Sequence, residues 1–173
     1  QLLDRMSRIP GTDDTGKIDV DELVAWLTEV RHLCREHARV DVGDHQLGQL
    51  LARAPAGEAG AWPCHAVCEA METIASKEVG TGFYIGVRNS RGMHSCGDGG
   101  EQERALAGKY RAFAEGLHFD YPFVGGVLEE IAASYDRDIR PGILHEVIEP
   151  VLAGYDVSTD GLKVHINPTG KFV

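Results

Sequence analysis

The chain is short of basic residues, and this shortage limits the partners that it is expected to bind. Lysine and arginine together number 17 against 27 aspartates and glutamates in 173 residues, which gives a formal net charge of −10. Surfaces that bind nucleic acids or anionic lipids are basic, because both ligands carry dense negative charge. We therefore expect neither a nucleic acid nor an anionic membrane among the partners.

Long apolar runs and a dense set of cysteines are also missing. No run approaches the roughly 20 apolar residues of a membrane-spanning helix, so we expect no span. The opening stretch QLLDRMSRIPGTDD lacks the basic-then-apolar order of a secretory signal. Four cysteines in a chain with 43% hydrophobic residues require no disulfide framework. The expected location is a reducing cytoplasm.

Helical periodicity, by contrast, is abundant. In five stretches apolar residues recur at spacings of three and four, which predicts amphipathic helices. A short aromatic connection, FDYPF, joins the last two and favours antiparallel packing between them. The fold is therefore predicted to be mainly α, with helices over about residues 20–38, 44–54, 63–79, 101–117 and 122–135.

The pattern changes in the stretch GFYIGVRNSRG. Phe83, Ile85 and Val87 alternate with small or polar residues, and the following NSRG has the composition of a turn. Alternation with a period of two is typical of a strand rather than a helix. We therefore predict one short extended segment near 82–92 within a helical module that covers residues 1–137.

The stretch GTDDTGKIDVDEL is similar to a calcium-binding EF-hand loop when it is aligned on Gly16. Asp13 and Glu22 then occupy the third and twelfth ligand positions. The first position, which normally supplies a carboxylate, is Gly11 and has no side-chain oxygen. Asp19 followed three residues later by Glu22 is instead typical of a capped helix start. We favour a polar loop that leads into a helix over a calcium site.

Cysteine and histidine residues gather in two neighbouring stretches. Cys64 and Cys68 are four apart and would share one face of a helix. With His94 and Cys96 they could form a tetrahedral zinc site, although the CxxxC and HxC spacings differ from the common CxxC. The alternatives are that the cysteines pack as small hydrophobic residues, or that one forms a nucleophile pair with a histidine. We favour packing as small hydrophobic residues over zinc, and zinc over the nucleophile pair.

The stretch GDGG at residues 97–100 precedes a predicted helix, where a phosphate could bind. It matches neither common phosphate-loop pattern, and Asp98, Glu101 and Glu103 would repel an anion. We interpret the stretch as a linker whose acidic neighbours complement the helix dipole, and Glu101 with Arg104 as a solvated ion pair. Five scattered histidines are interpreted as surface or cap residues: His32, His37, His45, His118 and His145.

The tail LHEVIEPVLAGYDVSTDGLKVHINPTGKFV closely resembles part of the central domain of S-adenosylmethionine synthetases, the methionine adenosyltransferases. The helix ending in EPVL and the element HINPTGKFV carry the likeness, over about residues 138–173. The resemblance implies ATP binding with Mg²⁺, a nucleotide site lined by Thr169, Gly170, Lys171 and Phe172, and packing of Phe172 against adenine. The family usually has Arg at the position of Lys171, which keeps the charge but not the planar fork.

The resemblance also divides the chain into two predicted domains. Residues 138–173 would be a fragment with partial α/β structure, containing one helix and an alternating strand. Residues 1–137 do not resemble the enzyme's first domain. Around WPCHAVCEAMETI and GGEQERALAGKYRAFAE they are similar to helical modules of uncharacterised bacterial proteins.

The sequence therefore predicts three alternative functions. The first is an incomplete S-adenosylmethionine synthetase-like chain, which we expect to be inactive alone because most of the family's equipment is missing. The second is a non-catalytic helical module that binds a protein partner through residues 1–137. The third is a zinc-stabilised module.

Overall fold

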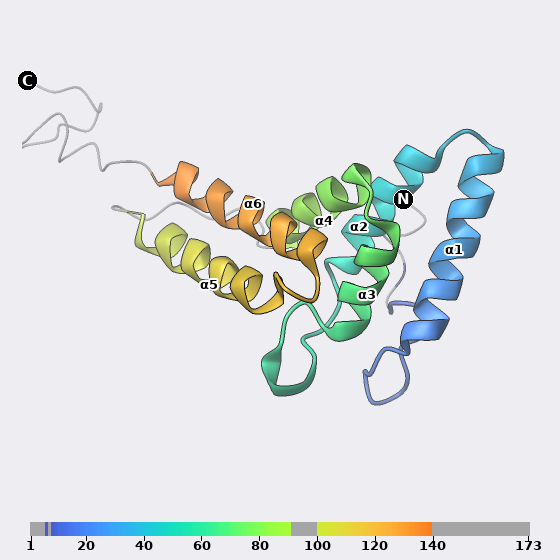
Figure 1. Cartoon of the computed structure of the whole chain (residues 1–173), viewed down its shortest axis with the longest axis horizontal. Coiled ribbons are helices and arrows are strands. Elements are labelled where there is room, and N and C mark those ends of the chain that lie inside the picture. Colours follow the sequence, from blue (N-terminus) through green and yellow to red (C-terminus); the bar gives the residue numbers. More distant parts are fainter. Residues whose placement is uncertain (1–5, 7, 91–99, 140–173) are drawn as a thin grey trace, which may run out of the picture. The chain divides into compact units, whose positions relative to one another are not determined.

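The computed structural model describes residues 6, 8–90 and 100–139, which belong to one compact unit of the chain, residues 1–139. The described part is mainly helical, which confirms the predicted fold class (Figure 1). None of its helices is both long enough and apolar enough to cross a membrane. The elements are α1 (Val20–Glu36), α2 (Val40–Leu51), the short 3-10 helix η2 (Glu58–Gly60), α3 (His65–Ile74), α4 (Lys77–Ser90), α5 (Glu101–Leu117) and α6 (Pro122–Asp138).

The start of α1 confirms the helix start predicted from GTDDTGKIDVDEL. Asp19 is the N-cap, and its Oδ1 accepts a hydrogen bond of 2.9 Å from the backbone N–H of Glu22. The backbone N–H of Asp19 donates to the carbonyl of Gly11 at 2.9 Å, so the loop itself supplies the second partner of the cap. Leu23 and Leu27, one turn apart, are the residues that α1 buries.

The extended segment predicted near 82–92 is wrong for residues 82–90, which form most of α4. Val79, Phe83 and Val87 are buried on one face of this helix at spacings of four. The alternation that suggested a strand arose because Tyr84 and Gly86 separate Phe83, Ile85 and Val87. Residues 91 and 92 lie outside the described ranges.

The glycines of α4 make close contact with α2. A Cβ added to Gly82 would lie 2.0 Å from the carbonyl oxygen of His45, and one added to Gly48 would lie 2.2 Å from that of Val79. At Gly86 an added Cβ would meet the Cβ of Ala52 at 2.7 Å. Because real Cβ atoms do not approach other atoms so closely, only glycine allows the two backbones to touch.

The single helix predicted over 63–79 is also wrong, since the structure divides it into α3 and α4. Ala75 ends α3 in the left-handed region at φ 42°, with its N–H bonded to the carbonyl of Met71 at 2.8 Å. Ser76 precedes the first residue of α4 and caps it, because its hydroxyl oxygen accepts a hydrogen bond of 3.2 Å from the N–H of Val79. A local cap therefore interrupts a continuous apolar pattern.

α5 and α6 pack side by side as a hairpin, which agrees with the expectation for two helices joined by a short connection (Figure 1). Tyr110 of α5 stacks on Tyr135 of α6, with 5.7 Å between ring centroids and 8° between ring planes. Trp62 contacts Phe83, Tyr110 and Phe113, so one aromatic ring joins the hairpin to α4. The hairpin is also attached through α6, which packs against α3 and α4.

Candidate functional site

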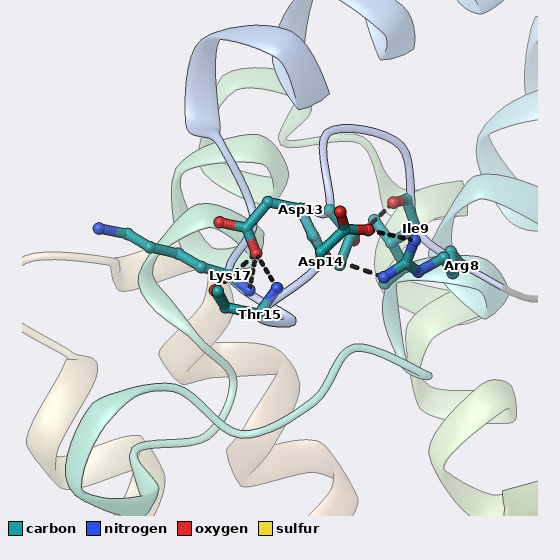
Figure 2. A network of polar contacts seen from close by, with 7 residues as sticks. Arg8, Ile9, Asp13, Asp14, Thr15 and Lys17 are labelled. Atoms are coloured by element: carbon teal, nitrogen blue, oxygen red, sulfur yellow. Dashed lines mark hydrogen bonds and ion pairs between the residues drawn. The ribbon is translucent and has the colours of Figure 1, made fainter.

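In the loop that resembles a calcium site, the Asp13 carboxylate binds groups of the loop itself. Oδ1 of Asp13 accepts hydrogen bonds from the N–H and hydroxyl of Thr15, at 2.8 and 2.6 Å, and from the N–H of Lys17 at 3.0 Å (Figure 2). The Thr15 hydroxyl is the main cause that lowers the pKa of Asp13. Arg8 binds the carbonyl of Asp13 from the other side at 3.0 Å.

This arrangement agrees with the interpretation as a polar loop. Across residues 6, 8–90 and 100–139, no three His, Cys, Asp or Glu side chains gather closely enough to hold a metal ion. The pairing of Thr12 with Ile18 and the cap at Asp19 hold the loop against α1.

Cys64 and Cys68, the first two predicted zinc ligands, are both buried and carry no disulfide. Burial, together with the neighbouring Cys64 thiol and Glu72 carboxylate, raises the pKa of Cys68 to about 12. Its Sγ lies 3.6 Å from the carbonyl of Pro63. The other two predicted ligands, His94 and Cys96, lie outside the described residues, so the zinc site stays a prediction.

A polar cluster that no local sequence pattern indicates joins α3 to the start of α6. The hydroxyl of Tyr121 lies 2.7 Å from Nδ1 of His65 and donates to Oε1 of Glu69 at 3.0 Å. Burial, and then the bond to Glu69, raises the pKa of Tyr121 to about 12, so its single proton stays in place. Because that proton goes to Glu69, the Tyr121 oxygen accepts from His65, which places the imidazole proton on Nδ1.

Glu72 adds a second link between the same two helices. Its Oε1 accepts a hydrogen bond of 2.9 Å from the backbone N–H of Val124, in the first turn of α6. The N-cap residue Tyr121 makes no side-chain cap bond of its own. Glu72 therefore caps α6 from another helix, which a search for nearby capping residues cannot detect.

Asp44 is the centre of a second unpredicted cluster, between α1, α2 and the start of α4. It is 3% exposed, and its carboxylate accepts two hydrogen bonds from Arg31, at 2.8 and 3.0 Å. The hydroxyl of Ser76 donates a third at 2.7 Å. These hydrogen bonds join three helices, so the cluster stabilises the fold.

A groove of about 720 Å³ opens beside the polar cluster. Three segments form its walls: the end of the N-terminal loop with the start of α1, the connection around η2, and the first turn of α3. The N-cap of α3, Cys64, makes no side-chain cap bond, and the first turn contains no acidic residue. The lining residues are Thr15, Gly16, Lys17, Ile18, Val20, Pro55, Ala56, Gly57, Glu58, Ala61, Cys64, His65 and Ala66.

The remaining candidates from the sequence are dispersed. Glu101 and Arg104 are exposed, whereas Glu103 is 1% exposed in the first turn of α5, where an acid complements the helix dipole. His37 and His118 follow the last residues of α1 and α5 as C-caps, as expected of cap residues. Gly100 is the N-cap of α5, and residues 97–99 lie outside the described ranges.

The nucleotide-site residues implied by the resemblance are not among the described residues. Thr169, Gly170, Lys171 and Phe172 all fall in 140–173, and so does His145. The predicted α/β tail lies in the same range. The nucleotide site and the tail therefore stay predictions from the sequence.

Similarity to known proteins was found over a small part of the chain. A segment of 37 residues, 21% of the chain, is 49% identical to an S-adenosylmethionine synthase from Sulfurovum sp. (strain NBC37-1). The matched segment spans 10% of that synthase. No family model matches the chain, and no solved structure matches it. The chain is thus similar over a short segment to an S-adenosylmethionine synthase.

Proposed function

We propose that the helical part of the chain, residues 1–137, is a non-catalytic module that binds a protein partner in the groove beside α3. The groove is the observation that carries this proposal, because it combines concave apolar walls with few polar groups. Its volume is about 720 Å³.

The polar chemistry of the described residues also supports binding rather than catalysis. Asp44, Glu72 and Tyr121 are each held by partners that stabilise contacts between helices. Cys68 is buried with a pKa raised to about 12, which does not suit a nucleophile at neutral pH. A module that binds a protein partner needs no catalytic group.

A peptide-display experiment tests this function while the partner is still unidentified. A random library is selected on the native chain and on a variant with a blocked groove, Ala61→Trp. Ala61 is exposed and lines the groove, so a large side chain there fills the space while the fold is kept. Ala105→Trp is the matched control, because Ala105 is an exposed alanine of α5 outside the groove.

The expected result is a set of peptides that bind the native chain and Ala105→Trp but not Ala61→Trp. Circular dichroism and thermal melting of all three proteins establish that the fold is the same. Selection that yields no peptides, or peptides that bind Ala61→Trp equally well, contradicts the proposed function.

A second candidate function, ATP binding by the tail, is supported by the 37-residue similarity to an S-adenosylmethionine synthase. By resemblance, Thr169, Gly170, Lys171 and Phe172 would contact the nucleotide, with Mg²⁺ bound to its phosphates. Equilibrium dialysis with Mg²⁺ and labelled ATP tests this, with Phe172→Ala expected to weaken binding by roughly tenfold through loss of stacking on adenine. Equal retention of ATP by both proteins, or none by either, counts against it.

A further inference from the structure

We infer that the groove binds an extended peptide segment that ends in a free carboxylate, the C-terminus of a partner protein. This inference rests on the proposed function and names the ligand of that same site. Three features of the groove lead to it: the charge of Lys17, the orientation of His65 and the apolar character of the walls.

Lys17 supplies the positive charge. Figure 2 shows its side chain extending away from the Asp13 carboxylate, while its backbone N–H remains bonded to that carboxylate. The first turn of α3 contributes a second favourable potential, because its N-terminal amides carry partial positive charge and no acid or side-chain cap neutralises them. Both features belong to the walls of one groove, so an anionic group there is stabilised from two segments.

The size of the charge distinguishes a carboxylate from a polyphosphate. Lys17 is the single lysine or arginine among the lining residues, and Glu58 is the single acid. A nucleotide triphosphate would meet one cation and one repelling carboxylate, which is an unfavourable balance for several negative charges. One carboxylate matches one lysine, and Glu58 remains to pair with a basic or amide group further along the peptide.

His65 adds a directed polar group at the rim. Because its Nδ1 donates its proton to Tyr121, Nε2 is left as an acceptor, which suits a backbone N–H of the bound peptide rather than its carboxylate. The same bond orients the ring, so the contact requires little further loss of side-chain freedom. The His65 side chain lines the groove and is 68% exposed.

The walls favour a peptide with small or branched apolar side chains. Val20, Pro55 and Ala61 present apolar surface to the groove. Capture of a terminal carboxylate together with an apolar side chain is an established mode of peptide recognition. The groove therefore suits a C-terminal segment better than a helix, which would need a longer apolar trough.

The test uses the native full chain and two matched pools of synthetic peptides. Both pools are N-acetylated tripeptides of alanine, valine and leucine; one has a free C-terminal carboxylate and the other a C-terminal amide. Binding is followed by 15N NMR shifts of the amides of His65 and Ala66. The variants are Lys17→Met and its control Lys109→Met, a lysine that lies over the aromatic rings of α5.

The free-acid pool is expected to shift these amides and to bind at least about tenfold more tightly than the amidated pool, the effect of one charged hydrogen bond. Lys17→Met should bind the free-acid pool more weakly by a similar factor, and Lys109→Met should bind it as the native chain does. Equal binding of the two pools, binding unchanged by Lys17→Met, or the same shifts with acetate alone at equal concentration would overturn the inference.

The two failures can be told apart. If neither pool binds but display selection yields peptides that Ala61→Trp rejects, the carboxylate assignment is wrong and the peptide-binding function stands. If display selection also yields nothing, the proposed function fails with it.

Discussion

The α2–α4 pair and the α5–α6 hairpin both contain glycines inside helices, but Gly48 and Gly82 of the pair differ in their surroundings from Gly108, Gly116 and Gly126 of the hairpin. At Gly48 and Gly82 an added Cβ would lie 2.2 and 2.0 Å from a backbone oxygen of the facing helix. At Gly108, Gly116 and Gly126 it would meet no atom of the described structure within 4 Å. The first set permits contact between backbones, whereas the second set costs helix stability without any packing gain inside this unit.

The ion pairs differ between the same two regions. Asp44 of α2 is buried and binds Arg31 through two hydrogen bonds. Asp136 of α6 binds Arg111 at 2.6 Å, but both side chains are about half exposed, at 45% and 51%. Because solvent screens the second pair, the two regions should respond very differently to the same substitution.

The largest effect is expected for Gly82→Ala. The new methyl group cannot fit beside the His45 carbonyl, so α2 and α4 must separate along their contact, at a cost of about 3 kcal/mol or more. Urea denaturation followed by circular dichroism measures the change. Gly126→Ala in α6 is the control, and a loss there as large as at Gly82 would remove the distinction between the two regions.

Asp44→Asn should be the next most damaging change. The amide keeps the shape of the carboxylate but leaves the partly buried Arg31 without its counter-charge, which we expect to cost about 2–3 kcal/mol. The matched change Asp136→Asn should cost less than about 1 kcal/mol, because that pair is solvated. Equal losses in thermal melting would show that burial does not separate the two pairs.

Gly108→Ala should stabilise the protein. The methyl group has open space, and alanine reduces the freedom of the unfolded chain, which together give about 0.5–1 kcal/mol. Gly116→Ala should act in the same way and additively, since the two positions lie two turns apart. A loss of stability at either site would mean that α5 is packed against something on this face.

The smallest effect is expected in the N-terminal loop, which lies outside both regions. Thr15→Val removes the main interaction that lowers the pKa of Asp13, so that pKa should rise toward its usual value. The lowered pKa stabilises the loop above the ordinary aspartate range, and this contribution is lost as the pH falls through the folded pKa. An NMR titration of the Asp13 carboxyl carbon measures this pKa in the native chain and in the variant. An unchanged pKa in the variant would contradict the role given to the Thr15 hydroxyl.

The sequence predicted features that depend on local spacing. The cap at Asp19 lies within three residues of its partner, and the boundaries of α5 follow from periodicity within the helix. It did not predict features whose partners are distant. The contact between His65 and Tyr121 joins residues 56 apart, and the groove is assembled from three separate segments.

The error at residues 82–90 has the same origin. A glycine next to apolar residues can occur in a strand as well as in a helix. That glycine lets α4 approach α2 closely is known only from the packing of the two helices. One signal in the sequence did favour the helix. Val79, Phe83 and Val87 recur every four residues, and this spacing competes directly with the alternation of Phe83, Ile85 and Val87.

The packing of this unit depends most on α4 being a helix that touches α2 through glycine. The most direct test is the set of 13Cα chemical shifts over Lys77–Ser90, together with a nuclear Overhauser contact between the Hα protons of Gly82 and protons of His45. We expect helical shifts throughout and a clear contact. Shifts typical of extended backbone at residues 82–90, with no such contact, would contradict this packing.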